Sequence, residues 1–522
     1  MANKLELTWY GKDEPIKVEP RLLIENAALS NTSLASDTEN MLIHGDNLLA
    51  LKALEQKYAG KVKCIYIDPP YNTGNAFDKY DDSIEHSIWL SLMECRFKYL
   101  YFLLKKDGFL FVNLDEQEHA YAKILLDGIF GRENYIGDII WQKRKGGGND
   151  SRYLALDHDY ILVYAKDVSK ETHPQKWRTA QSIEYLKRYK EIDEDGRHYY
   201  WDTVARNGLQ SPIPISIVCP DGTVLSINSQ IGQSSIDNGL LNGTVRLTKS
   251  KNGWTLHHKV YMGEGQVQRS IMNDVGTNKT AGDEMEYLFG DKKAFPYPKP
   301  ESLISRILEL STKQGDLVLD SFLGSGTTAA VAHKMGRRYI GIEMGDHAYT
   351  HCKVRLDKVI AGEDQGGVTK SQNWQGGGGY RFYELAPTLI NKDAFGEAVI
   401  NPDYNADTLA AAVALHEGFT YQPNADFFWR QATGNENSYL FTTTRHLTAD
   451  YLDAIKGSME EDEYLVIACR SYDKGLDKAY TNIAVKKIPQ MLLDRCEFGK
   501  DDYSLNIVHP PVYEDEEVED DE

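Results

Sequence analysis

Two blocks of alternating strand and helix patterns, separated by a segment of different composition, restrict the folds open to this chain of 522 residues. In the first block, apolar runs at 41–46, 62–70 and 108–115 are each followed by helical spacing. The second block repeats that rhythm around strand patterns at 316–322 and 338–344. Because strands that alternate with helices favour parallel pairing, the pattern predicts a doubly wound α/β sheet.

Composition shifts divide the chain into segments. Residues 167–275 are rich in Asn, Gly, Ser and Gln and break the rhythm, so the two blocks are either two domains or one sheet split by an insertion. A glycine-rich stretch after the second block is typical of a linker. The expected segments are an N-terminal extension (1–40), the first block (41–166), an insertion (167–290), the second block (291–360), a linker (361–379), a mixed α/β module (380–512) and an acidic disordered tail (513–522).

Cysteine spacing, hydropathy and charge narrow the class of protein. The six cysteines lie far apart without a C-x-x-C pair, which predicts reduced thiols in a cytoplasmic protein and neither a zinc site nor a disulfide framework. No signal-type start and no long apolar run is seen, which argues against secretion and a membrane span. Since the net charge is −20, any DNA-binding surface would have to be a local basic patch on an acidic body.

The stretch "DSFLGSGTT" (320–328) lies directly between a strand pattern and a helix pattern. Gly324 and Gly326 permit a tight turn and a close backbone approach, and the next strand ends on Glu343, where an acid can hold ribose hydroxyls. A third glycine and a phosphate-binding P-loop are absent. The pattern therefore favours a nucleoside without a pyrophosphate, and S-adenosylmethionine (AdoMet) fits better than NAD or ATP. A simple helix-packing turn is the alternative.

The stretch "CIYIDPPYNTG" (64–74) ends a buried strand on a carboxylate and a rigid corner. Asp68 and the Pro69 carbonyl offer two acceptors on one side, and proline adds no competing N–H donor. An exocyclic NH2 group could give one hydrogen to each acceptor, which would direct its lone pair toward an electrophile. Tyr71 adds a flat face for a nucleobase. The alternative is a strand-terminating turn with a structural Asp.

Together, "DPPY" and "DSFLGSGTT" resemble the amino-methyltransferases of DNA, which methylate N6 of adenine or N4 of cytosine. The resemblance implies a Rossmann-like AdoMet-dependent fold and no metal. It implies that the catalytic residues are Asp68, Pro69, Pro70 and Tyr71. "FPYPKPESLI" (295–304) and "HGDN" (44–47) resemble further cofactor segments of that family. The implied cofactor residues are therefore Asp46, Lys299, Pro300, Asp320, Phe322, Gly324, Gly326, Thr327 and Glu343.

The catalytic corner precedes the glycine motif, with the insertion between them, and this order resembles the circularly permuted β-class enzymes. That resemblance implies one sheet split by a target-recognition insertion, with a catalytic half at 41–166 and a cofactor half at 291–360. Four further stretches, "IIWQKRKGGGND", "HDYILVYAKD", "NDVGTNKTAGDEMEYLF" and "KKIPQMLLDRCEFGKDDYSLNI", resemble the modification (Mod) subunits of Type III restriction–modification systems. They imply double-stranded DNA as substrate, a homodimer, a separate helicase-nuclease (Res) partner, and a dimerisation or docking role for residues 380–512.

D-P-P-Y usually accompanies adenine in that family, so the resemblance favours N6 of adenine over N4 of cytosine. A base inside a duplex is out of reach and must be flipped out of the stack. Trp141 and Phe77 are the candidates for a second stacking face, although a Trp at a strand end is often core. Asp115 ends another strand and is either a site acid or a helix cap.

The basic, glycine-rich stretch at 142–152 is a candidate DNA-binding loop. Lys143, Arg144, Lys145 and Arg152 would meet phosphates there, unless the stretch is an ordinary surface loop. Sequence recognition would then lie within 167–275. The competing functions are a DNA-recognition subunit that guides a nuclease-translocase, with methylation secondary, and methylation of RNA or of a protein amide.

Overall fold

The computed structural model describes most of the chain and divides it into two compact units. The larger comprises 1–174 and 269–522, and the smaller comprises 175–268. The described residues are 7–13, 16–70, 82–146, 153–169, 172, 177–179, 183–206, 208, 210–263, 265–493, 495–501 and 503. None of the helices in these ranges has both the length and the apolar content that a membrane span requires.

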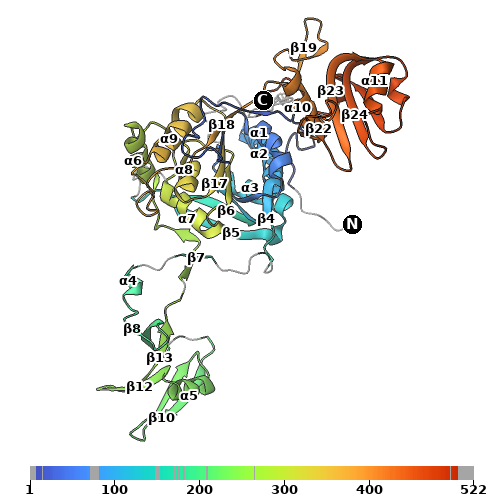
Figure 1. Cartoon of the computed structure of the whole chain (residues 1–522). Helices are drawn as coiled ribbons and strands as arrows, with labels where there is room; N and C mark the ends of the chain where they lie inside the picture. The colour runs from blue at the N-terminus through green and yellow to red at the C-terminus, as the bar shows by residue number, and fades with distance from the viewer. Residues whose placement is uncertain are drawn as a thin grey trace, which may run out of the picture. The chain divides into compact units, whose positions relative to one another are not determined.

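A ten-stranded sheet forms the centre of the larger unit (Figure 1). Its middle strands are parallel, and its β4–β6–β5 side is antiparallel. In spatial order the strands are β1 (Leu23–Glu25), β18 (Arg381–Leu385), β2 (Met41–His44), β17 (Arg338–Glu343), β16 (Leu317–Asp320), β3 (Val62–Ile67), β4 (Leu104–Leu114), β6 (His158–Ala165), β5 (Tyr135–Gln142) and β15 (Ile271–Met272). The expected α/β class is confirmed.

Strands of the two sequence blocks alternate within this sheet. β16 pairs in parallel with β3, where Val318 lies opposite Cys64 and Leu319 opposite Ile65, and β17 pairs with β2. Hence the two blocks form one split sheet. Because the carboxyl ends of parallel strands meet at one edge, the residues after β3 and those after β16 share that edge.

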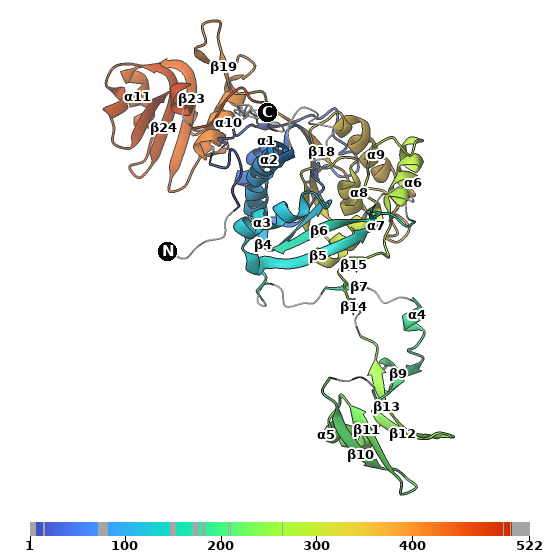
Figure 2. The same cartoon turned by 180° about the vertical axis from the view of Figure 1, so that it is seen from behind.

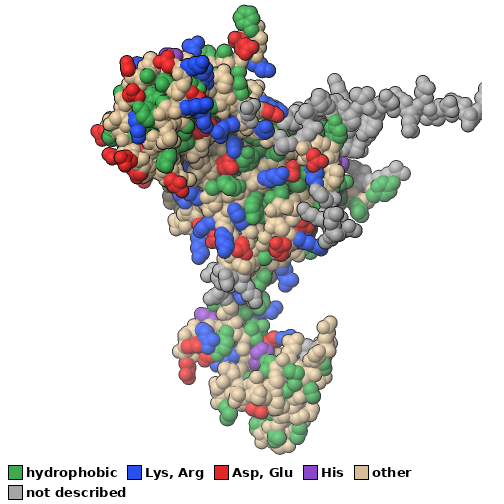
Figure 3. All heavy atoms as spheres, turned by 90° about the vertical axis from the view of Figure 1, so that its right-hand side faces the viewer, with side chains coloured by type: hydrophobic (Ala, Val, Ile, Leu, Met, Phe, Trp, Pro, Cys, Tyr) green, Lys and Arg blue, Asp and Glu red, His purple; other side chains and the backbone are tan. Residues whose placement is uncertain are grey.

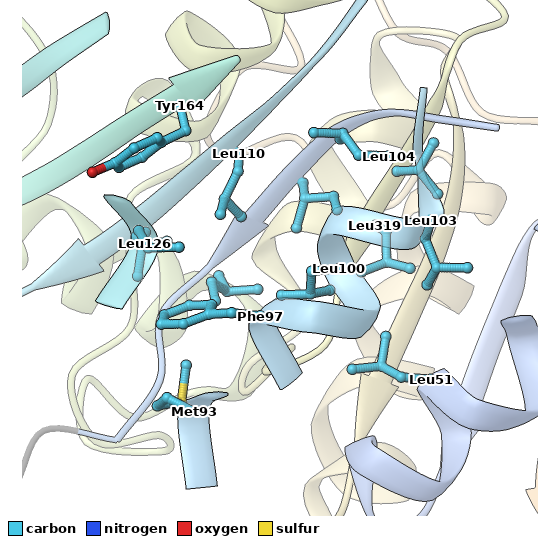
Figure 4. Packing of buried hydrophobic residues seen from close by; sticks show 14 of the residues in the cluster. Leu51, Met93, Phe97, Leu100, Leu103, Leu104, Leu110, Leu126, Tyr164 and Leu319 are labelled. Carbon is cyan, nitrogen blue, oxygen red and sulfur yellow. The ribbon is translucent and has the colours of Figure 1, made fainter. Parts of the chain in front are cut away.

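Helices cover both faces of the sheet (Figures 1 and 2). The first three lie on one face, where Leu51, Phe97 and Leu126 pack against Leu110 and Leu319 of the strands (Figure 4). The helices of the larger unit up to residue 361 are α1 (Asn47–Tyr58), α2 (Asp82–Leu103), α3 (His119–Phe130), η1 (Arg132–Asn134), α6 (Asn278–Phe289), α7 (Glu301–Ser311), α8 (Thr327–Lys334), the π-helix η2 (Ala348–Lys353) and α9 (Val354–Ala361).

The smaller unit has its own core, which includes Ile215, Ile236 and Leu256. It is narrower than the predicted insertion of 167–290, because β15 and α6 belong to the larger unit. Its elements are β7 (Arg178–Thr179), α4 (Ile183–Leu186), β8 (Glu191–Ile192), β9 (His198–Thr203), β10 (Ile213–Val218), β11 (Val224–Ser229), α5 (Gln233–Leu241), β12 (Val245–Ser250), β13 (Gly253–Tyr261) and β14 (Gln266–Val267).

The predicted linker at 361–379 is a packed segment instead. Asp364, Val368 and Thr369 are buried, and Asp364 pairs with the buried Lys334 at 2.7 Å. The glycines of this segment permit close turns, but the segment packs against the rest of the larger unit and is not a flexible linker. The N-terminal extension and the predicted C-terminal module also contribute to the large sheet, through β1 and β18.

The region after β18 contains a second, five-stranded sheet with cores around Val413 and Ile467. The predicted acidic tail at 513–522 lies outside the described residues. The elements of this region are β19 (Ile390–Lys392), β20 (Ala398–Ile400), α10 (Ala406–Glu417), β21 (Thr420–Tyr421), β22 (Ala432–Thr433), β23 (Ser438–Leu447), α11 (Ala449–Lys456), β24 (Tyr464–Tyr472), η3 (Leu476–Lys478), β25 (Ile483–Lys487) and α12 (Gln490–Leu493).

Candidate active site

A cavity of about 750 Å³ opens at the carboxyl edge of the large sheet. Both predicted motifs line it, one from each half of the split sheet, and so does the segment before α7. Among the predicted residues, those on its wall are Asp46, Asp68, Pro69, Pro70, Asp115, Lys143, Arg144, Lys299, Asp320, Phe322, Gly324, Thr327 and Glu343. Pro300 and Gly326 lie directly beside it, as the N-caps of α7 and α8.

The carboxylate of Asp68 is held from two sides. The ammonium of Lys299 donates to its Oδ2, and Nδ2 of Asn113 donates to Oδ1 at 3.3 Å. Its side chain is still 23% exposed and lines the cavity. The indole of Trp89 donates to the Pro70 carbonyl at 3.0 Å, which anchors the Pro-Pro corner to the core. The corner therefore presents an oriented carboxylate to the cavity.

Asn113 links Asp68 to a second, buried carboxylate. Its Nδ2 also lies 3.4 Å from Oδ2 of Asp159, whose Oδ1 pairs with Lys143 at 2.6 Å. Neither Asn113 nor Asp159 was predicted. Both are polar side chains buried in strands, which is unusual and could have marked them as candidates. A buried Asn in β4 and a buried Asp in β6 were the available signals.

This pairing corrects the prediction for Lys143, which balances a buried carboxylate instead of standing free for phosphate. Arg144 is exposed at the cavity wall, and Lys145 is exposed but does not line it. Arg152 lies outside the described residues. Asp115 lines the cavity, and its Oδ1 accepts from the backbone N–H of Gln117 at 3.1 Å in the turn before α3, whose N-cap is Glu118.

The glycine motif forms a tight turn into α8. Gly324 and Gly326 have φ values of 57° and 82°, the left-handed region that L-residues with a side chain rarely adopt. A Cβ on Gly324 would lie 3.1 Å from the Phe295 ring, and one on Gly326 would lie 3.1 Å from the Cys352 backbone. Glycine is required here for both conformation and space.

Two acids line the cavity beside the glycine turn. The Glu343 carboxylate accepts from the backbone N–H of Gly324 at 2.8 Å and of Gly345 at 3.0 Å, so it holds the glycine turn closed. Asp320 accepts from the Phe322 N–H at 2.9 Å. Burial raises the pKa of the Asp320 carboxyl to about 7.

Asp46 lines the cavity, but its carboxylate is used structurally. Oδ1 caps α1 by accepting from Leu48 N at 2.8 Å, and Oδ2 accepts from Tyr503 N at 3.1 Å. The guanidinium of the buried Arg96 lies 3.4 Å from Oδ2. The predicted contact of Asp46 with a cofactor therefore competes with these partners.

The structure changes which aromatic residues are candidates for stacking on a base. Trp141 is fully buried and its indole donates to the Gly276 carbonyl at 2.9 Å, so it is core and cannot stack on a base. Tyr71 and Phe77 lie outside the described residues. Tyr297, which was not predicted, lines the cavity, is 78% exposed and has a φ of 52°. Strained backbone at a non-glycine residue is often found at functional sites.

A buried ionic cluster lies behind the glycine turn. Glu301, the first residue of α7, pairs with Lys334 at 2.8 Å and with Arg355 at 2.9 Å, and accepts from Val368 N at 2.9 Å. Arg355 also donates to Thr327 Oγ1 at 2.8 Å. The cluster thus joins the start of α7 to the start of α8. Within the described ranges, no group of three acid, His or Cys side chains is arranged to hold a metal ion.

Comparison with known families agrees with this arrangement. A family model described as "DNA methylase" matches residues 62–353, which is more than half of the chain. The chain belongs to the DNA methylase family. The matched range includes the Pro-Pro corner after β3, the insertion, the glycine turn and Glu343.

Individual curated proteins are also similar to this chain. The chain is 35% identical over 406 residues to the probable type III restriction-modification enzyme HindVI Mod subunit of Haemophilus influenzae, covering 67% of this chain and 54% of that protein. It is 30% identical over 358 residues to the StyLTI Mod subunit of Salmonella typhimurium, covering 61% and 54%. The chain thus spans about half the length of these two relatives.

Among solved structures, PvuII DNA methyltransferase, described as cytosine-N4-specific, aligns with 14% identity and a TM-score of 0.36. The alignment covers 65% of this chain and 90% of that one.

Proposed function

We propose that the chain is a site-specific DNA methyltransferase that transfers a methyl group from AdoMet to N6 of a flipped adenine in duplex DNA. The observation that carries the proposal is the single cavity lined by Asp68 of the catalytic corner and by the glycine turn at Gly324. Family membership supports it, and so does the similarity to Mod subunits.

The residues on the cofactor side fit AdoMet. The cavity volume lies within the range of ordinary ligand pockets. At Gly324 the backbone itself forms part of the cavity wall. The carboxyl groups of Asp320 and Glu343 would favour a ligand that is a cationic nucleoside and whose ribose offers hydroxyl donors. When bound, AdoMet supplies an electrophilic methyl group on a sulfonium.

The chain's own residues would orient the attacking amine. Asp68 would accept one N6–H and the Pro69 carbonyl the other, which turns the nitrogen lone pair out of ring conjugation. A carboxylate can accept about four hydrogen bonds, so the contacts with Lys299 and Asn113 do not by themselves use up the acceptor capacity of Asp68. Once the amine is methylated it is cationic, and its surplus proton would leave by way of Asp68 or solvent.

Two aromatic rings would hold the base. Tyr71 is the face expected from the sequence, and Tyr297 replaces Trp141 as the second candidate because it is exposed on the cavity wall. Stacking between two rings compensates for part of the cost of extruding the base.

The D-P-P-Y motif favours adenine as the target base, with N4 of cytosine as the alternative. The test is sequencing, with modification detection, of DNA from cells that express the chain. We expect methyladenine at one recurring sequence. The Asp68→Ala variant should lose that mark but still bind AdoMet. Methylcytosine at the site would overturn the base assignment, and an active Asp68→Ala would remove that carboxylate from the mechanism.

The similarity to the HindVI and StyLTI Mod subunits further supports a role as the modification subunit of a Type III-like restriction–modification system. In that role the chain would form a homodimer and guide a separate Res subunit. Co-expression with a neighbouring helicase-nuclease gene, followed by purification and a cleavage assay, tests this. A chain that methylates but neither binds nor directs that partner would be a solitary methyltransferase.

A further inference from the structure

The smaller unit differs in charge from the rest of the chain. Residues 175–268 contain eleven Lys and Arg and nine Asp and Glu, whereas the whole chain has a net charge of −20. On the face of the molecule seen in Figure 3, Lys and Arg are interspersed with Asp and Glu on the larger unit and form no continuous basic surface. A polyanion would therefore meet less repulsion at the smaller unit.

A hollow of about 640 Å³ in the smaller unit gathers several of its cations. Three come from the segment between α4 and β8, one comes from β12, and β9 supplies two aromatic rings. The lining residues are Lys187, Arg188, Lys190, Glu191, Tyr200, Trp201 and Arg246. We call this set the basic hollow.

The cations of the basic hollow differ in their partners from four other cations of the unit. Elsewhere, four described cations each pair with a neighbouring carboxylate: Arg197 with Asp195, Arg206 with Asp202, Lys249 with Asp221 and Lys259 with Asp193. Within the described ranges, no carboxylate lies within ion-pair distance of the four cations of the basic hollow. All four side chains are exposed. The basic hollow thus brings together four exposed cations that no described carboxylate neutralises.

The aromatic floor fixes part of this surface. The Arg246 guanidinium lies 4.0 Å from the centre of the Trp201 ring, and the Trp201 indole donates to Glu191 at 3.1 Å. A guanidinium stacked on a ring keeps its N–H donors at the edge, directed away from the ring face. Arg246 is therefore oriented before any ligand arrives, which reduces the entropy lost on binding.

We propose that the basic hollow binds the phosphodiester backbone of duplex DNA, an inference that rests on the proposed function. Exposed Lys and Arg side chains without carboxylate partners can bind phosphate groups. Three of the four lie within residues 187–190, so they could contact neighbouring phosphates of one DNA strand. Contacts to phosphates fix the position of the protein on the duplex, whereas contacts to base edges in the grooves carry the sequence information. The hollow contributes affinity and register, and other residues of the unit read the sequence.

The test is the salt dependence of DNA binding by the full-length protein, measured by fluorescence anisotropy on two labelled duplexes. One duplex carries the methylated site found by sequencing, and the other is unrelated. In the variant Lys187→Gln/Arg188→Gln/Lys190→Gln, the plot of log affinity against log salt should lose about 0.9 in slope per cation, and affinity should fall about a hundredfold near physiological salt. Both duplexes should be affected equally, because phosphates are common to both.

The matched control is Lys249→Gln, an exposed lysine of the same unit that already pairs with Asp221. It should leave the slope nearly unchanged. An unchanged slope in the triple variant, or a loss confined to the duplex with the site, would overturn the inference. If the wild-type protein binds AdoMet but neither duplex, the proposed function fails instead.

Discussion

The ammonium of Lys299 contacts the carboxylate of Asp68, although 231 positions separate the two residues in the sequence. Asp68 follows β3 in the first block, and Lys299 precedes α7 in the second. The ion pair therefore joins the two halves of the split sheet inside the candidate active site.

Replacing Lys299 by Met should slow methyl transfer more than it weakens AdoMet binding. Without the ammonium, the Asp68 carboxylate loses an orienting contact, and a small misplacement of a reacting group can cost about a hundredfold in rate. Single-turnover methylation and AdoMet titration measure the two effects. Lys292→Met is the control, since that lysine pairs with the exposed Asp283 outside the cavity. Equal rates in both variants would show that Lys299 does not position Asp68.

Removing the Tyr297 ring should weaken capture of the flipped base. Stacking is worth about 1–3 kcal/mol per base, so Tyr297→Ala should reduce the fluorescence gain of 2-aminopurine at the target position, and Tyr297→Phe should restore it. Tyr287→Ala, at an exposed tyrosine of α6 that does not line the cavity, serves as the control. If Tyr297→Ala extrudes the base as well as wild type, another ring forms the second face.

The affinity for AdoMet should rise with pH through about 7. The raised pKa of Asp320 means that its carboxyl is protonated below that pH in the free protein, while a cationic ligand favours the ionised form. Binding should therefore release a proton near pH 7, which calorimetry in buffers of different ionisation enthalpy can measure. Asp320→Asn should bind more weakly and lose this proton release. The same release in that variant would assign it to another group.

Breaking the buried cluster at Glu301 should destabilise the larger unit. Glu301→Ala leaves Lys334 and Arg355 buried without this partner, and removing one member of a buried ion pair typically costs about 3–5 kcal/mol. Denaturant unfolding measures the change. The exposed pair of Lys292 and Asp283 is the comparison, because Lys292→Ala should cost about 0–1 kcal/mol. Similar losses of unfolding free energy in both variants would show that the buried ion pairs of Glu301 stabilise the protein no more than the exposed pair does.

Several features followed from local sequence alone. The strand and helix patterns around residues 41–166 and 291–360 were enough to predict the α/β class, because hydrophobic periodicity reports which face of each element is buried. Gly324 and Gly326 were identifiable because residues with a side chain rarely adopt the left-handed turn that they form. Asp68 was identifiable because a carboxylate at the end of an apolar strand, followed by two prolines, is uncommon.

Tertiary structure decided which side chains are available. Trp141 and Lys143 looked like ligand contacts, but one is core and the other balances Asp159. The contacts of Lys299 and Asn113 with Asp68, and the exposure of Tyr297, could not be predicted, because they depend on segments that meet only when β16 inserts beside β3. Periodicity records the burial of a residue within its own element, whereas charge pairing and cavity walls arise between elements distant in the chain.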